Sequence, residues 1–162
     1  MEDVRVRPAA LQEILALRHR ELRPGFPESA ARFEDDEAPT TRHLGAFRVS
    51  GEVVGCASFV ASPWEKRPAF RLRGMATRAD CRRRGIGTRL LRRGEAMLRA
   101  ATDAELLWCN ARLVAVPFYA HLGWQVVSAV FDVPTVGPHR RMVRPLAGQP
   151  RTAGSRSTPA GQ

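Results

Sequence analysis

Two spacings of hydrophobic residues divide the chain into predicted strands and helices. Alternation with a period of two, or a short apolar run, predicts strands at residues 4–7, 43–49, 53–61, 70–77, 106–110, 124–133 and 139–145. Apolar residues three and four positions apart predict helices at residues 8–23, 86–101 and 117–122. Residues 26–41 predict a short helix and an acidic loop, which is either a solvated surface or a wall of a substrate pocket.

The helix at residues 86–101 has the most regular pattern. Its apolar positions fall on one arc of less than half the helical wheel: Ile86, Leu90, Leu91, Gly94, Met97 and Leu98. Charged residues, Glu95 among them, take the other side, so the helix should lie on a sheet. Gly94 costs about 1 kcal/mol against alanine, which close approach to the sheet would explain. The strands that this helix joins, 70–77 and 106–110, should be parallel with a right-handed crossover.

A basic, glycine-containing loop precedes this helix: Arg82, Arg83, Arg84, Gly85, Ile86, Gly87 and Thr88. Such a loop at a helix N-terminus can bind phosphate, because free N–H groups and the helix dipole attract an anion there. A P-loop would need lysine where Thr88 stands, and a dinucleotide fingerprint would need glycine where Leu90 stands, so both motifs are excluded. The remaining pattern, Arg82-x-x-Gly85-x-Gly87, indicates either another phosphate site or a solvated basic turn.

Composition is that of one soluble globular domain with a strong positive charge. The 162 residues are 44% hydrophobic and 26% charged, with a net charge of +10, and Lys66 is the one lysine among 26 basic residues. This bias raises the possibility of an arginine-rich nucleic-acid-binding domain. Such a domain should interleave stacking aromatics with the arginines, but only Phe70 lies near the cluster, which disfavours this function.

The remaining sequence features narrow the cellular setting. Cys56, Cys81 and Cys109 are far apart and odd in number, and the histidines lack ligand spacing, so we expect reduced thiols, no metal site and a cytoplasmic location. No apolar run approaches the length of about 18 residues that a membrane span needs. The domain should cover residues 1–146, and residues 147–162 should be a disordered tail because they lack periodicity.

A second motif follows the strand at 106–110. The run from Asn110 to Trp124 reads Asn-Ala-Arg-Leu-Val-Ala-Val-Pro-Phe-Tyr-Ala-His-Leu-Gly-Trp. Together with Arg82-x-x-Gly85-x-Gly87, it resembles the two signatures of the GNAT superfamily of N-acyltransferases, with Trp124 in place of the usual phenylalanine. The resemblance extends over residues 4–146 and points to a bacterial branch. It implies an α/β (α+β) domain whose mixed, mostly antiparallel sheet contains a splayed parallel strand pair, with helices on both faces.

The resemblance also implies acetyl-CoA as cosubstrate. The backbone of Met75, Ala76 and Thr77 would hydrogen-bond the pantetheine arm like an added strand. The loop from Arg82 to Thr88 would hold the pyrophosphate. Asn110 would either bond a pantetheine amide or cap the end of its strand.

The implied reaction is direct attack, in a ternary complex, of a primary amine of an unidentified small-molecule or peptide acceptor on the thioester. Tyr119 lies where the family has a general acid, and its reference pKa of about 10, above that of a thiol at about 8.5, would keep it protonated. The alternative for Tyr119 is a packing role. A non-catalytic acyl-CoA-binding module and a homodimer are left open.

The general base is also left open. The family often has a glutamate on the central strand, where this chain has Arg71 and Arg73. The candidates are a water molecule or one of five side chains: Glu34, Asp35, Asp36, Asp132 and His139.

Overall fold

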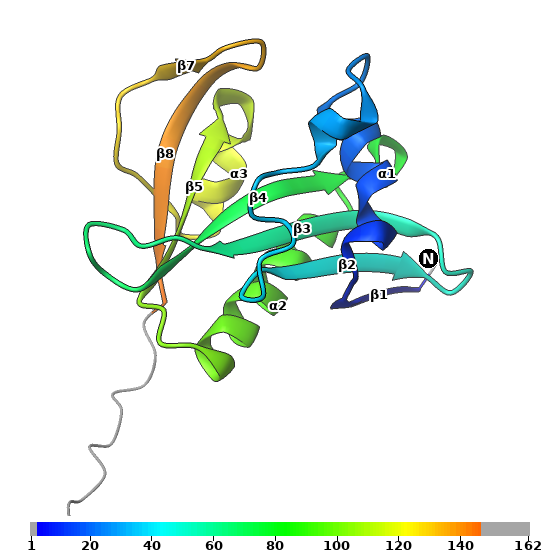
Figure 1. Ribbon diagram of the computed structural model, residues 1–162, viewed down its shortest axis with the longest axis horizontal. Coiled ribbons are helices and arrows are strands. Elements are labelled where there is room, and N and C mark those ends of the chain that lie inside the picture. Colours follow the sequence, from blue (N-terminus) through cyan, green and yellow to red (C-terminus); the bar gives the residue numbers. More distant parts are fainter. Residues whose placement is uncertain (1–2, 147–162) are drawn as a thin grey trace, which may run out of the picture.

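The computed structural model describes residues 3–146, so the prediction of a disordered tail at 147–162 lies outside the described residues. Eight strands form one sheet in the order β1-β2-β3-β4-β5-β8-β6, with β7 also pairing with β8 (Figure 1). The strands are β1 (Val4–Pro8), β2 (Arg42–Arg48), β3 (Val53–Ala61), β4 (Ala69–Thr77), β5 (Leu106–Arg112), β6 (Gln125–Val126), β7 (Phe131–Val133) and β8 (Gly137–Pro145). The helices are α1 (Leu11–Leu22), α2 (Ile86–Ala101) and α3 (Val116–His121), and short 3₁₀ turns cover Glu28–Ala31, Ala79–Cys81 and Leu113–Ala115.

The parallel pair β4 and β5 separates after a short stretch of pairing. Its register runs from Ala69↔Leu106 to Arg71↔Trp108, whereas all other neighbours in the sheet are antiparallel. Beyond this point β4 stays paired with β3, and β5 stays paired with β8 as far as Arg112↔His139. The predicted splayed pair is therefore confirmed, and among the described residues no strand pairs with one edge of β4 beyond Arg71.

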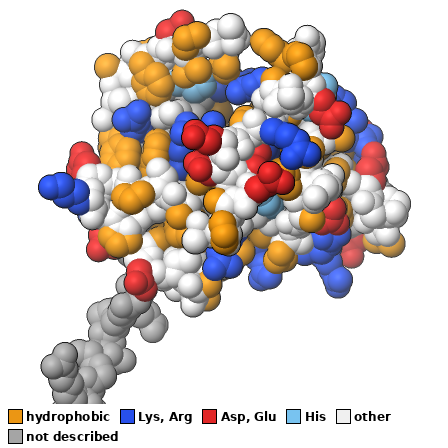
Figure 2. All heavy atoms as spheres, viewed as in Figure 1, with side chains coloured by type: hydrophobic (Ala, Val, Ile, Leu, Met, Phe, Trp, Pro, Cys, Tyr) orange, Lys and Arg blue, Asp and Glu red, His pale blue; other side chains and the backbone are white. Residues whose placement is uncertain are grey.

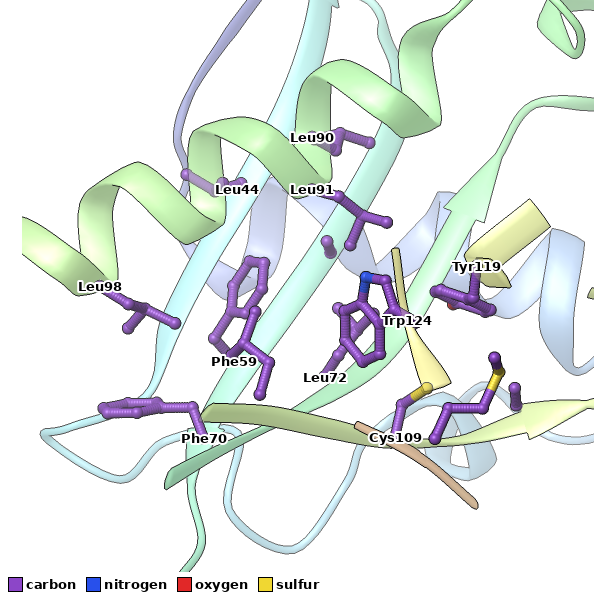
Figure 3. Close-up of a cluster of buried hydrophobic side chains, with 14 of the residues drawn as sticks. Leu44, Phe59, Phe70, Leu72, Leu90, Leu91, Leu98, Cys109, Tyr119 and Trp124 are labelled. Atoms are coloured by element: carbon purple, nitrogen blue, oxygen red, sulfur yellow. The ribbon is translucent and has the colours of Figure 1, made fainter. Parts of the chain in front are cut away.

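Helices α1 and α2 cover opposite faces of the sheet (Figure 1). Leu90, Leu91 and Leu98 of α2 are buried against Phe59 of β3 in the larger core cluster (Figure 3). A smaller cluster joins Leu11, Ile14, Leu15 and Leu17 of α1 to Cys56 and Ala76 of the sheet. The predicted apolar arc of α2 and the helices on both faces are thus confirmed.

Gly94 lies where α2 packs tightly on the sheet, as its place in the apolar arc predicted. A Cβ atom at this position would overlap the ring of Phe59. Gly94→Ala should therefore lower the free energy of unfolding by about 1–3 kcal/mol through overpacking, despite the better helix propensity of alanine. Urea denaturation measures this change.

The exposed Ala96 provides the matched control for Gly94. Ala96→Gly should cost only the propensity difference of about 1 kcal/mol. A Gly94→Ala variant more stable than the wild type would contradict the close approach of helix and sheet.

A fully buried arginine ties the acidic segment to α1. Arg18 has an exposed fraction of 0%, and its Nη1 donates to Asp36 Oδ2 at 2.7 Å and to the carbonyl of Ala31 at 2.9 Å. Its Nη2 donates to Ser58 Oγ of β3 at 2.7 Å. These bonds offset the desolvation cost of the buried charge. Asp36 is consequently buried, so a wholly solvated acidic loop is the wrong description of this segment.

Three local expectations were wrong. Glu95 is buried, and two arginines pair with its carboxylate: Arg144 of β8 at 3.4 Å and Arg99 at 3.5 Å. The strand expected at 106–110, β5, does not end at Asn110 but continues to Arg112. The single strand expected at 124–133 is broken into β6 and β7.

The break between β6 and β7 follows from an unequal number of residues along β8. Val126 pairs with Met142 and Phe131 with His139, so four residues on one side face two on the other. The hydroxyl of Ser128 accepts the backbone N–H of Arg141 at 2.8 Å, which replaces a ladder bond.

Candidate active site

The loop before α2 has the backbone of an anion site. Gly85 caps the helix with a φ of +77°, and the N-terminus has no side-chain capping bond. No side chain in the described part of the protein therefore uses the first-turn N–H groups, which can bind a ligand. Arg83 also has a positive φ, of +62°, and residues 82–85 are exposed. The arrangement fits a diphosphate group.

Arg82 is fixed to two neighbouring elements. Its Nη2 lies 3.0 Å from Glu21 Oε2 of α1, and its Nε donates to the carbonyl of Thr77 at 3.3 Å. The loop is thereby held between the end of β4 and the end of α1. Arg83 and Arg84 are exposed beside it.

Gly87 connects this loop to the gap in the sheet. A Cβ atom there would lie 3.0 Å from Met75 Cε and 3.2 Å from Phe118 Cζ, and Gly87 itself is half-buried. The helix N-terminus therefore packs directly on β4 and α3, which leaves little room for a larger residue.

A cavity of about 250 Å³ opens where β4 and β5 separate. Its wall is formed by the second half of β4, the end of β5, the C-terminus of α1, Tyr119 of α3 and the turn between β7 and β8. Met75 lines this cavity, but no described residue of the loop at 82–88 does. The cavity and the phosphate-type loop are thus separate regions that meet at Met75.

Tyr119 lies at the edge of the gap and is buried, with 8% of its surface exposed. Its hydroxyl donates to Met75 Sδ at 3.6 Å, and its ring packs on Phe118 with centroids 5.2 Å apart. The ring also packs on Trp124, again with centroids 5.2 Å apart (Figure 3). Burial, and secondarily the nearby Cys109, raises the pKa of Tyr119 well above its usual value. The side chain therefore keeps its proton at neutral pH.

His139 is the one candidate base that lines the cavity among the described residues. It is buried, it stacks on Phe131 at 6.0 Å, and its Nδ1 lies 2.7 Å from the carbonyl of Gly137. A carbonyl can only accept, so Nδ1 carries the hydrogen and Nε2 of the neutral ring is left as the acceptor.

The structure separates the acidic candidates from the cavity. Asp36 is held by Arg18 and by the backbone N–H of Phe33, at 2.6 Å. Glu34, Asp35 and Asp132 are exposed and do not line it. Asn110 does line it, and its Oδ1 accepts a hydrogen bond from Arg141 Nε at 3.2 Å.

Comparison with known proteins identifies the family. A sequence model of the acetyltransferase (GNAT) family matches residues 9–124, more than half of the chain. The chain belongs to the GNAT family. It is an acetyl-CoA-dependent N-acetyltransferase, and a curated relative, the uncharacterized N-acetyltransferase YitI of Bacillus subtilis, is 35% identical over 147 residues, covering 87% of this chain and 95% of YitI.

Solved structures share the fold of this acetyltransferase. A putative N-acetyltransferase from Lactobacillus plantarum gives a TM-score of 0.74 at 17% identity, over 88% of this chain and 98% of that chain. An aminoglycoside 6'-N-acetyltransferase complexed with coenzyme A gives 0.71 at 16% identity, over 90% and 99% of the two chains. The splayed β4–β5 pair thus belongs to a fold that also occurs in a coenzyme A complex.

Potential metal ligands, cysteines, helix lengths and surface charge further characterise the described part of the acetyltransferase. The described residues hold no cluster of three or more potential metal ligands, and their three cysteines are free and buried. None of the described helices is long and apolar enough to span a membrane. Acidic and basic side chains lie side by side near the centre of the face in Figure 2, so this face is not a continuous basic surface of the kind that binds nucleic acid.

Residues to which the sequence analysis gave no role in the site complete the cavity wall. Phe33 and four arginines line it: Arg23, Arg71, Arg73 and Arg112. Arg71 and Arg73 stand two residues apart on β4 and therefore share a face of the strand. Nothing in the sequence indicated that Arg23, at the end of α1, would join them.

Proposed function

We propose that the enzyme transfers the acetyl group of acetyl-CoA to a primary amine of a small-molecule or peptide acceptor by direct attack in a ternary complex. The observation that supports this most is the cavity between β4 and β5, which has Tyr119 in its wall and the exposed N-terminus of α2 close by. The cavity supplies space for an acceptor beside the gap in the sheet.

The residues present fit acetyl-CoA in the manner of the family. In this proposal the backbone of Met75, Ala76 and Thr77 binds the pantetheine arm, because no strand from residues 3–146 pairs with the edge of β4 beyond Arg71. The N–H groups of residues 82–88, with Arg82, Arg83 and Arg84, bind the pyrophosphate. Asn110 orients Arg141 instead of the pantetheine, since its Oδ1 is already hydrogen-bonded.

Tyr119 and His139 divide the proton transfers in this proposal. The hydroxyl of Tyr119 donates a proton to the departing thiolate, because Tyr119 lies in the cavity wall and its raised pKa keeps the hydroxyl protonated until the thiolate leaves. Nε2 of His139 accepts the proton of the attacking amine, directly or through water. The buried ion pair of Asp36 and the exposure of Glu34, Asp35 and Asp132 make these carboxylates poorer candidates.

His139→Asn tests the base. The shorter amide can still donate to the Gly137 carbonyl but lacks the Nε2 acceptor, so turnover at neutral pH should fall about 100-fold. The loss should shrink as the pH approaches the pKa of the acceptor amine, because the amine then arrives neutral. Rates measured from pH 7 to pH 10 check this.

The matched control is His121→Asn, since His121 is exposed on α3 and does not line the cavity. Its rates should equal those of the wild type at every pH. A His139→Asn variant with wild-type turnover at neutral pH would remove His139 as the base and leave a water molecule.

A panel of primary amines mixed with acetyl-CoA tests the proposed function. Thiol release should depend on the amine, and mass spectrometry should find one acetyl group on its nitrogen. Tight acetyl-CoA binding without thiol release for any amine would favour the non-catalytic binding module.

We further propose a cytoplasmic location, which the three free cysteines support.

A further inference from the structure

The cavity between β4 and β5 is lined by cations and lacks acidic side chains. Arg23, Arg71, Arg73 and Arg112 line it together with His139, and none of the described lining residues is Asp or Glu. Within the described residues, none of these arginines forms an ion pair with a carboxylate. Four arginines therefore line a small space, and none of the described lining residues supplies a carboxylate to pair with them.

Stacking holds two of these arginines over aromatic rings. The guanidinium of Arg71 lies 5.0 Å from the ring centre of Trp108, and that of Arg73 lies 4.5 Å from the ring centre of Phe33. Nε of Arg71 is buried without a hydrogen-bond partner in the described part of the chain. A stacked guanidinium keeps its N–H edge available, and that edge matches a carboxylate or phosphate.

Burial and repulsion by neighbouring arginines lower the pKa values of three arginines that line the cavity. Burial, and then the neighbouring Arg73 and Arg141, lower the pKa of Arg71 to about 10. Burial also lowers the pKa of Arg73 and of Arg23. Asp36, Asp35 and Glu34 oppose the shift at Arg73, but Asp36 is already paired with Arg18. A bound anion would relieve this repulsion.

We infer that the acceptor amine carries an anionic group, a carboxylate or a phosphate, and that Arg71 and Arg73 bind it. This inference rests on the proposed function, because it assigns the cavity to the acceptor. The pyrophosphate loop is a separate region, since no described residue from 82 to 88 lines the cavity. The cavity volume of about 250 Å³ suits a compound of amino-acid size.

The same cations assist the reaction. An ammonium group beside several guanidinium groups is destabilised, so the pKa of a bound amine falls and more of it is neutral. The anionic group of the acceptor offsets that repulsion during binding. A polyamine has no such group, and the cavity should reject it.

Pairs of amines that differ in one charge test the inference. The pairs are glycine with glycinamide, glutamate with glutamine, and phosphoethanolamine with ethanolamine, with putrescine as the polycation. For at least one pair the anionic member should be acetylated about 10-fold faster or more, as expected for hydrogen bonds to a charged group. The phosphate pair and the carboxylate pairs show which anion is preferred.

Substitution of the arginines links this preference to the cavity. Arg71→Gln and Arg73→Gln should each bring the ratio of the two acetylation rates within a pair towards one. Arg71→Lys and Arg73→Lys should keep part of the preference for the anionic member. Arg92→Gln, on the exposed side of α2, removes the same charge elsewhere and should leave the ratio unchanged. Thermal denaturation identifies any variant that fails to fold, and the lysine variants then decide.

Two outcomes would overturn the inference without touching the proposed function. One is faster acetylation of the neutral members or putrescine, and the other is a preference that survives both glutamine variants. If no amine is acetylated, calorimetry of the N-acetylated pairs with the coenzyme A-saturated protein decides. Tighter binding of the anionic members supports the inference although the proposed function fails, and equal binding overturns it.

Discussion

Replacing Tyr119 with phenylalanine should lower turnover by about 10²–10³-fold and leave the affinity for acetyl-CoA nearly unchanged. The ring would keep its packing against Phe118 and Trp124, so the variant removes the proton and little else. The hydroxyl contacts Met75 Sδ at 3.6 Å, a weak interaction whose loss should cost little stability. Single-turnover kinetics with an acceptor from the panel measure the effect.

A thioester with a more acidic thiol separates acid catalysis from mispositioning. Such a leaving group needs less protonation, so the deficit of Tyr119→Phe should shrink, whereas a misplaced substrate would slow both thioesters equally. If chemistry limits the rate and Tyr119→Phe still turns over like the wild type, Tyr119 is a packing residue.

Gly87→Glu should weaken acetyl-CoA binding by more than about 10³-fold, so that calorimetry no longer detects it. The reason is that the pyrophosphate would lose both the N–H groups at the N-terminus of α2 and their electrostatic attraction. A glutamate there brings a negative charge to the first turn of α2. Its side chain must also displace the ends of Met75 and Phe118, which lie about 3 Å from the added Cβ.

Ala96→Glu is the matched control for Gly87→Glu. It adds the same charge to an exposed position of α2, two turns away from the loop, and should leave the affinity within about twofold. Circular dichroism should show both variants folded. Unchanged affinity in a folded Gly87→Glu would contradict the assignment of the pyrophosphate to this loop.

Much of the fold is predictable because it depends on patterns within single elements. Neighbouring residues alone are enough to interpret three of these patterns: the apolar arc of α2, the alternation along the strands and the glycine at position 94. The parallel direction of β4 and β5 follows from the helix between them. The splay was predicted only through the family resemblance, since nothing in the residues of β4 or β5 indicates where their pairing ends.

Buried charges were missed because their partners come from distant segments. Arg18 falls on the apolar stripe of α1 between Leu15 and Leu22, and this register is a usable signal of burial. Its partner Asp36 lies 18 positions further along the chain, in a run that resembles a solvated surface. Glu95 likewise depends on Arg144 of β8.

The candidate site likewise has one part that the sequence predicts and one part that it does not. The loop at 82–88 and Tyr119 belong to contiguous motifs, so the sequence could point to them. The cationic cavity combines Arg23 of the α1 end with Arg71, Arg73 and Arg112 of two strands, and its lack of a carboxylate is a property of three-dimensional packing. The sequence revealed only that arginines replace the glutamate often found on this strand.

A crystal structure of the protein with coenzyme A and an N-acetylated acid from the panel tests the central claim most directly. We predict the pyrophosphate on the N–H groups of residues 82–88, the thiol sulfur beside the hydroxyl of Tyr119, and the acid's anionic group on Arg71 and Arg73. Density for the pantetheine outside the gap between β4 and β5, or a sulfur remote from Tyr119, would contradict the account.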